Sequence, residues 1–152
     1  MSVLVDTNIL LRAIQPASPL QQVTLDALAV LEALGEQLCL VPQNLYEFWV
    51  AGTRPAAQSG LALSALEAEH EITQICRRFQ LRDDPPQLYG QWLSLVSPQQ
   101  IIGKNAHDAR LVAAMQLHGI DKLLTLNGAH FQRYARIVVL APQDVVNSPP
   151  SP

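Results

Sequence analysis

The sequence predicts an α/β protein in which a central, mostly parallel sheet is flanked by helices. Short apolar runs rich in β-branched residues, such as residues 3–5, alternate with longer segments whose apolar residues recur at helical spacing. The short runs are apolar throughout, as expected of strands that are buried on both faces of a parallel sheet. This alternation therefore predicts strands connected by helices that cover both faces of the sheet.

Length and composition indicate one globular domain. The chain has 152 residues, of which 49% are hydrophobic and 15% charged, so a substantial core is expected and wholesale disorder is not. We expect a single domain over residues 1–146 and a disordered Pro/Ser-rich tail over residues 147–152. No apolar run approaches the roughly 20 residues that span a bilayer, which predicts a soluble, cytoplasmic protein without membrane contact.

The elements follow in order along the chain. Strands are expected at residues 3–5, 38–41, 122–126 and 136–140. Helices are expected from residue 9, between residues 20 and 34 before Gly35, from Pro42 through residue 50, over 65–79, over 88–96 and over 105–117. Because the apolar and aromatic residues from Leu45 to Val50 are nearly continuous, the helix that begins at Pro42 is expected to be largely buried.

Three acidic residues differ from the solvated ones in where they fall. Asp6 ends the first strand, Glu47 is the only charge among residues 43–50, and Asp108 opens the helix over 105–117. Each also has a purely structural interpretation. Asp6 can cap the helix that follows, Asn105 and Asp108 have the spacing of a capping box, and Glu47 can point outward between two core faces. His107 is about 100° around the helix from Asp108, which favours a supporting role over ligation.

The predicted topology brings these acidic residues together. Strand ends and the following helix starts share one edge of a parallel sheet, so Asp6, Asp108 and Asn127 should meet there, with Glu47 within reach. Neighbouring carboxylates repel one another unless a cation neutralises them, and hard oxygen ligands suit Mg²⁺ or Mn²⁺. A metal held in this way can polarise a phosphodiester and activate a water molecule.

Other chemistries lack their motifs in this sequence. The only Gly-Lys pair, Gly103-Lys104, is followed by Asn105, so there is no phosphate-binding P-loop. The sequence contains neither a dinucleotide-binding glycine motif nor a nucleophile elbow, and its four histidines do not have zinc spacing. The net charge of −3 argues against a protein that coats duplex nucleic acid, but it is compatible with an acidic metal pocket.

Four motifs in the same order resemble a PIN domain, and the chain is most similar to the VapC-type toxin ribonucleases. They are residues 5–8 (Val-Asp-Thr-Asn), Glu47, residues 107–113 (His-Asp-Ala-Arg-Leu-Val-Ala), and residues 124–127 (Leu-Thr-Leu-Asn) with Phe131. The resemblance covers the chain apart from its tail. It implies a compact α/β/α sandwich around a mostly parallel sheet.

The resemblance also implies an activity and a set of partners. The expected activity is Mg²⁺- or Mn²⁺-dependent cleavage of single-stranded RNA by in-line attack of water, leaving a 3′-hydroxyl and a 5′-phosphate. Asp6, Glu47 and Asp108 match the acidic metal-binding positions, with Asn127 as a fourth site residue and Thr7, Asn8, Thr125 and His107 in support. Relatives of this kind are usually homodimers neutralised by a small antitoxin protein.

The sequence departs from the family pattern at the fourth acidic position. Family members often carry Asp at the position of Asn127, or just before the Phe, where this chain has His130. Asn127 adds no charge, so a weakened or single-metal site is expected. Two alternatives stay open: a PIN fold that binds RNA or protein without cutting, and an RNA-processing nuclease without an antitoxin. Candidate RNA contacts are Arg77, Arg78, Lys104, Arg110 and Arg133.

Overall fold

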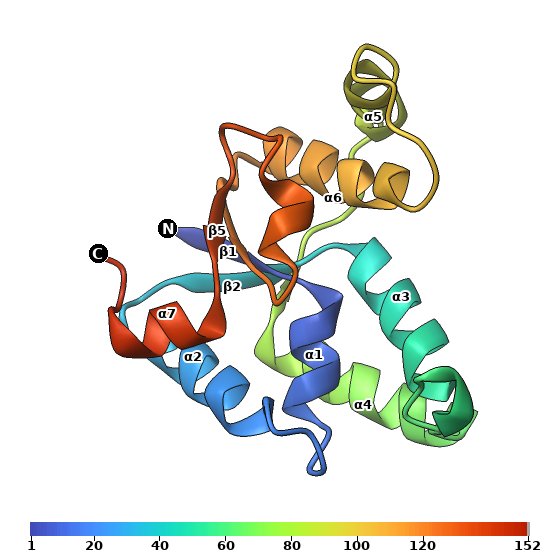
Figure 1. Ribbon diagram of the computed structural model, residues 1–152, viewed down its shortest axis with the longest axis vertical. Coiled ribbons are helices and arrows are strands. Elements are labelled where there is room, and N and C mark those ends of the chain that lie inside the picture. Colours follow the sequence, from blue (N-terminus) through green and yellow to red (C-terminus); the bar gives the residue numbers. More distant parts are fainter. Residues whose placement is uncertain (152) are drawn as a thin grey trace.

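A five-stranded, all-parallel sheet forms the centre of the computed structural model, which describes residues 1–151 (Figure 1). The strands are β1 (Ser2–Val5), β2 (Gln37–Leu40), β3 (Gln80–Leu81), β4 (Lys122–Leu124) and β5 (Val138–Leu140), and their order across the sheet is β3-β2-β1-β4-β5. β1 is therefore central, with Leu4 paired to Cys39 on one side and to Leu123 on the other. The predicted fold class is confirmed.

Within residues 1–151, seven α-helices cover the sheet. They are α1 (Thr7–Ala13), α2 (Gln21–Ala33), α3 (Pro42–Thr53), α4 (Ala65–Arg78), α5 (Leu88–Val96), α6 (Asn105–His118) and α7 (Pro142–Asn147), and short 3₁₀ turns lie at Ala56–Gln58 (η1) and Gly128–Phe131 (η2). Figure 1 shows α5 and α6 on one side of the sheet and α1, α2 and α7 on the other. The result is the expected α/β/α sandwich.

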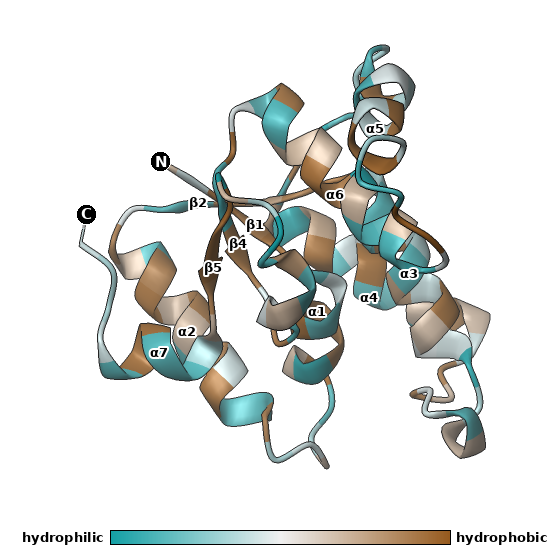
Figure 2. Ribbon diagram, turned by 45° about the horizontal axis from the view of Figure 1, so that its top comes forward, coloured by the Kyte–Doolittle hydropathy of each residue, from teal (hydrophilic) through white to brown (hydrophobic). Residues whose placement is uncertain are grey.

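Strand alternation divides the apolar side chains into two cores. Successive residues of a strand point to opposite faces. Leu4 accordingly packs in a cluster with the buried face of α6, whereas Val3 and Val5 pack with α1, α2 and α7. Figure 2 shows the corresponding hydrophobic colour on the strands, with mixed colour on the helices around them. Because both faces are covered, continuously apolar strands were the correct signal for this sheet.

The expected burial of α3 is wrong. Tyr46, Trp49 and Val50 are exposed by 66%, 38% and 56% of their surface, while Phe48 is fully buried. The helix is therefore amphipathic in its packing although its sequence is not, and one aromatic face is left open. Glu47 consequently lies at a partly exposed position, not within a core.

Two local expectations also need correction. The two-residue edge strand β3 continues the chain just beyond α4, in a stretch for which we expected no strand. Asn105 and Asp108 do not form a capping box: α6 begins after Lys104, and no side chain caps it. A strand of two residues has too little sequence to produce a periodic pattern, and Gly103 places the helix start with its positive φ of 63°.

The last helix, α7, reaches the expected end of the domain. Helix α7 includes Asn147, and residues 148–151 follow it, so the boundary expected at 146/147 coincides with the last turn of a helix. The disordered tail stays a prediction, and its last residue, Pro152, lies outside the described residues. Within residues 1–151, no helix combines the length and the apolar character needed to cross a membrane.

Candidate active site

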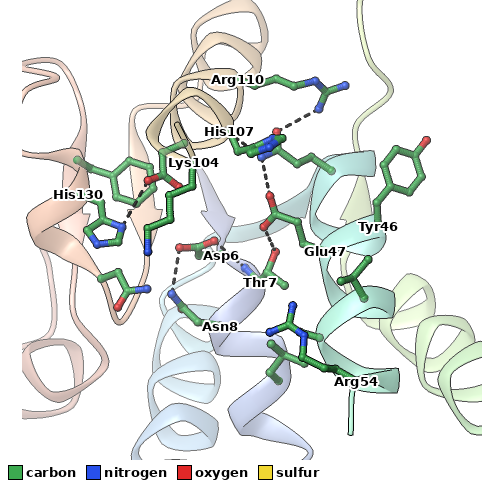
Figure 3. Close-up of a pocket in the computed structure, with 17 residues that line it drawn as sticks. Asp6, Thr7, Asn8, Tyr46, Glu47, Arg54, Lys104, His107, Arg110 and His130 are labelled. Carbon is green, nitrogen blue, oxygen red and sulfur yellow. Dashed lines mark hydrogen bonds and ion pairs between the residues drawn. The ribbon is translucent and has the colours of Figure 1, made fainter. Parts of the chain in front are cut away.

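A pocket of about 930 Å³ opens at the carboxyl edge of the sheet, where the sequence placed the acidic residues. Seven of the eight predicted site residues line it: Asp6, Thr7, Asn8, Glu47, His107, Asp108 and Asn127. The eighth, Thr125, is buried immediately behind Asp6. Figure 3 shows Asp6, Thr7 and Asn8 at the start of α1, Glu47 on α3 and His107 at the start of α6 around this pocket. The predicted meeting of the three carboxylates at one sheet edge is therefore observed.

Asp6 is the innermost carboxylate of the pocket. It follows the central strand, its backbone N–H donates to Leu124 O at 2.9 Å, and only 9% of the residue is exposed. One carboxylate oxygen accepts the Thr7 N–H at 2.8 Å, which caps α1. The other accepts the Thr125 hydroxyl at 2.7 Å and the Asn8 amide at 3.2 Å. The capping and site interpretations of Asp6 are thus compatible, because one oxygen caps while the residue faces the pocket.

Glu47 reaches the pocket from the first half of α3. One of its oxygens accepts the Thr7 hydroxyl at 3.2 Å, and the other accepts the side-chain amide of Gln43 at 2.8 Å. Gln43 lies one turn earlier on the same helix and is itself buried. The carboxylate is therefore held toward α1 and the sheet, as Figure 3 shows.

Asp108 lies in the first turn of α6, where the helix dipole favours a negative charge. Its Oδ2 is 3.4 Å from Nδ1 of His130, and its side chain is 28% exposed. Asn127 is exposed on the rim, and its backbone N–H donates to Thr125 at 3.0 Å. His107 contributes through its backbone, since its carbonyl accepts the Gln43 amide at 2.8 Å. The supporting role of the His107 side chain stays a prediction.

Two of the three carboxylates, those of Asp6 and Asp108, have raised pKa values. Burial raises the pKa of Asp6, and the charges of Glu47 and Asp108 raise it further, against the opposing hydrogen bonds from Thr125 and Thr7. Burial also raises the pKa of Asp108, with Glu47 adding to the effect and His130 opposing it. Both groups are thus less favourably ionised than free carboxylates, which is the expected result of collecting negative charge in a pocket.

These shifts predict the pH dependence of stability when no divalent cation is present. A raised folded-state pKa means that the folded protein retains protons that the unfolded chain has already released. The free energy of unfolding should therefore fall as pH rises from about 3.8 through the raised pKa values.

Asp6→Asn removes the part of this loss of stability that comes from ionising Asp6. At neutral pH this variant should therefore be at least as stable as the wild type. Urea unfolding across the acid range measures this, with Asp26→Asn on the exposed face of α2 as the matched control. A wild-type protein that gains stability relative to Asp6→Asn over this pH range would contradict the assignment.

Sequence reasoning missed Gln43 and Arg54. Gln43 links three parts of the site, because its amide donates to Glu47 and to His107 O while its oxygen accepts Arg110 Nη1 at 3.1 Å. The only sequence signal was its spacing of four residues before Glu47. Arg54 lines the far end of the pocket and lies beyond any recognised motif. Of the expected RNA contacts, Lys104 and Arg110 line the pocket, whereas Arg78 is paired with Glu32 at 2.9 Å on the outer surface.

The donor set fits a hard divalent cation, although the side chains do not converge on one point. Three carboxylates face the pocket, and two of them have pKa values raised by burial and by neighbouring carboxylates, so a cation would relieve this repulsion. Among residues 1–151, no three His, Cys, Asp or Glu side chains are clustered closely enough to hold a metal as they stand. Holding a metal would require Glu47 and Asp108 to move toward Asp6, and Glu47 could keep its hydrogen bond from Gln43 because a carboxylate oxygen has a second lone pair.

Comparison with known proteins supports the fold. No family model matches the sequence, and no curated protein matches it. Solved structures do match, each with probability 1.00. A chain of the VapBC2 complex from Rickettsia felis, bound to a promoter DNA fragment, gives a TM-score of 0.69 at 15% identity, covering 93% of this chain and 98% of that one.

Two further matches have similar scores. VapC20 of Mycobacterium tuberculosis, a toxin that cleaves the sarcin-ricin loop, gives a TM-score of 0.63 at 15% identity over 87% of this chain and 95% of that one. A toxin-antitoxin complex from Klebsiella pneumoniae gives 0.61 at 21% identity over 92% of this chain and 97% of its own. The chain therefore has the PIN-like α/β/α fold of these toxin and toxin-antitoxin structures.

Proposed function

We propose that this protein is a metal-dependent endoribonuclease that cleaves single-stranded RNA as the toxin of a toxin-antitoxin pair. The observation that carries the proposal is the meeting of Asp6, Glu47 and Asp108 in one pocket at the carboxyl edge of the sheet. The fold supports it, because a structure with the same fold is a toxin that cleaves the sarcin-ricin loop. Fold alone does not assign an activity, so the carboxylates carry the chemical part of the argument.

Asp6, Glu47 and Asp108 are the residues that would hold Mg²⁺ or Mn²⁺. When bound, such a cation polarises a phosphodiester and lowers the pKa of water. Thr125, Thr7 and Asn8 fix the Asp6 carboxylate through the hydrogen bonds described above, so this group is preorganised. Asn127 at the rim contributes an amide without charge, which suits orientation of substrate or water better than neutralisation of a second cation.

Basic residues around the carboxylates would bind the RNA backbone. Lys104 and Arg54 are exposed and line the same pocket as the three acids, and Arg110 lines it from α6. Phosphate contacts of this kind position a strand without reading its sequence. We therefore propose that an unpaired RNA strand crosses the three carboxylates and that these basic side chains hold its phosphates.

The partners in this proposal are an antitoxin and a second copy of the chain. Several of the solved structures that share the fold are complexes of a toxin with its antitoxin. The exposed aromatic face of α3, formed by Tyr46, Trp49 and Val50, is apolar surface beside the pocket that a partner could cover. The homodimer expected from the sequence resemblance stays a prediction.

Two observations favour a second candidate, a PIN fold that binds RNA without cutting it. The fourth acidic position is filled by Asn127, and the carboxylates within residues 1–151 are not arranged as a ready metal cluster. A protein of this kind would bind single-stranded RNA equally well with or without divalent cations.

The test is cleavage of a labelled single-stranded RNA by the purified protein in Mg²⁺, in Mn²⁺ and in EDTA, with analysis of the product ends. The proposal expects cutting with either metal, none in EDTA, and products carrying 5′-phosphate and 3′-hydroxyl groups. Binding without cutting under all three conditions would favour the non-catalytic candidate.

Gln43 should be a positioning residue for this activity. Gln43→Ala removes the amide that holds Glu47 and leaves the His107 carbonyl without its partner, so we expect the cleavage rate to fall about 10- to 100-fold with little change in KM. The matched control is Gln22→Ala, which breaks the exposed Gln22–Asp26 pair of the same helical spacing on α2. Equal loss of rate in the two variants would show that Gln43 has no specific role.

A further inference from the structure

A second pocket, of about 490 Å³, adjoins the candidate active site and has a different character. It lies between the segment that follows β3, helix α5 and the start of α6. Its walls include the rings of Tyr89 and Trp92 together with Pro85 and Pro86, and its polar groups are Asp84, His107 and Arg110. His107 and Arg110 line the first pocket as well, so the two spaces meet at these residues.

Of the two aromatic rings in this pocket, one is exposed and the other is held by a hydrogen bond. Tyr89 is 71% exposed, and its ring centroid is 6.1 Å from that of Trp92, with an interplanar angle of 34°. Trp92 Nε1 donates to Ala106 O at 2.8 Å, which ties the indole to the first turn of α6, two residues before Asp108. Figure 1 shows α5 on the outside of the molecule against α6, so the outer side of this helix faces away from the sheet. Tyr89 therefore offers an exposed ring, and the indole of Trp92 beside it is fixed relative to the acidic centre.

Arg110 lies between the two pockets and lines both of them. Its guanidinium donates to Asp84 at 2.8 Å and to Gln43 at 3.1 Å, so it is fixed in position by one group from each side. Asp84 therefore links the segment before α5 to α6 through its ion pair with Arg110. A fixed guanidinium can contact a phosphate or lie against a base. The aromatic rings of the second pocket, the guanidinium of Arg110 and the carboxylates of the first pocket therefore follow one another in this order.

We propose that the Tyr89–Trp92 pocket binds an unpaired base of the RNA strand next to the phosphodiester held at the carboxylates. The inference rests on the proposed function and names how that site would grip its substrate. Base stacking on aromatic rings accepts any base, and here the exposed ring of Tyr89 lies beside the hydrogen-bonded indole of Trp92. A strand whose phosphodiester reaches the carboxylates past Arg110 places its neighbouring base over these rings.

The experiment uses the full-length chain with Asp6→Asn, to prevent cutting, and Trp49→Phe, which leaves Trp92 as the only tryptophan. Titration with a short single-stranded RNA of mixed sequence should quench the fluorescence of Trp92, and an abasic strand of equal length should not. Adding Tyr89→Ala should weaken the RNA affinity about tenfold, while Tyr89→Phe should stay within about twofold. Leu93→Ala, on the same helix and exposed by 43%, is the control that should leave affinity unchanged.

Two results would overturn the inference: unchanged RNA affinity in Tyr89→Ala, or equal quenching by the abasic strand. If Tyr89→Ala leaves RNA affinity unchanged but changes the mass of the protein measured by analytical ultracentrifugation, a second copy of the chain covers the pocket. Cleavage by the otherwise wild-type protein is measured in parallel. If it cuts RNA while Tyr89→Ala binds normally, the base subsite fails and the nuclease stands. Base-dependent quenching without any cutting would leave the subsite standing and refute the nuclease.

Discussion

Replacing Asp6 or Asp108 by Asn should reduce RNA cleavage by at least about a hundredfold, without loss of the fold. Each substitution removes one negative charge from the pocket but keeps a side chain of similar size. The catalytic contribution of a bound cation is several kcal/mol, and each 1.36 kcal/mol corresponds to a tenfold change in rate. Asn at position 6 can still accept the Thr7 N–H that caps α1, so the local structure should persist.

The measurement is the single-turnover cleavage rate of a labelled single-stranded RNA, with circular dichroism to confirm folding. Asp26→Asn is the matched control, because Asp26 is an exposed aspartate on α2 whose hydrogen bond from Gln22 an asparagine can also accept. Rates of Asp6→Asn and Asp108→Asn within about threefold of the control would remove the carboxylates from the mechanism, because such a ratio is well under 1 kcal/mol.

The second large effect is expected at the opposite edge of the sheet. Lys122 at the start of β4 and Glu36 just before β2 form a buried ion pair, with side chains only 11% and 5% exposed. Removing one partner leaves a buried charge without compensation. Glu36→Gln or Lys122→Met should therefore lower the free energy of unfolding by about 3–5 kcal/mol. That is a large share of the roughly 5–15 kcal/mol by which a domain is stable.

Urea unfolding of the single and double variants tests this pair. The double variant Glu36→Leu with Lys122→Met replaces the pair by apolar groups and should recover most of the loss, since buried pairs are often replaceable in this way. The residues precede or begin their strands, whereas Asp6 and Thr125 follow theirs, so the folded fraction of each variant should cut RNA normally. Losses under about 1 kcal/mol in both single variants would mean that water or other groups solvate these charges.

Much of the fold was predictable because strands and helices left separate signals. The strands around β1 are apolar without interruption because both faces are covered, and α6 is apolar around its circumference from Leu111 to Met115 because it is buried. The placement of Asp6 and Asp108 near each other was predictable because strand ends and helix starts meet at one sheet edge. The pocket brings them together as expected.

The rest depends on tertiary contacts that sequence patterns do not contain. An apolar run such as that in α3 shows which residues could be buried, but not which face finds a partner, so Tyr46 and Val50 were misjudged. Gln43 resembles any other polar helical residue until α6 places the His107 carbonyl beside it. Tyr89 likewise gains its proposed role only because α5 lies beside the start of α6.

The central claim is that Asp6, Glu47 and Asp108 together hold a divalent cation, and calorimetric titration with Mn²⁺ tests it most directly. The account predicts binding to the wild-type protein and loss of that binding in Asp6→Asn, with Asp26→Asn behaving as wild type. Absence of Mn²⁺ binding to the wild-type protein, or binding of equal strength to Asp6→Asn, would contradict it.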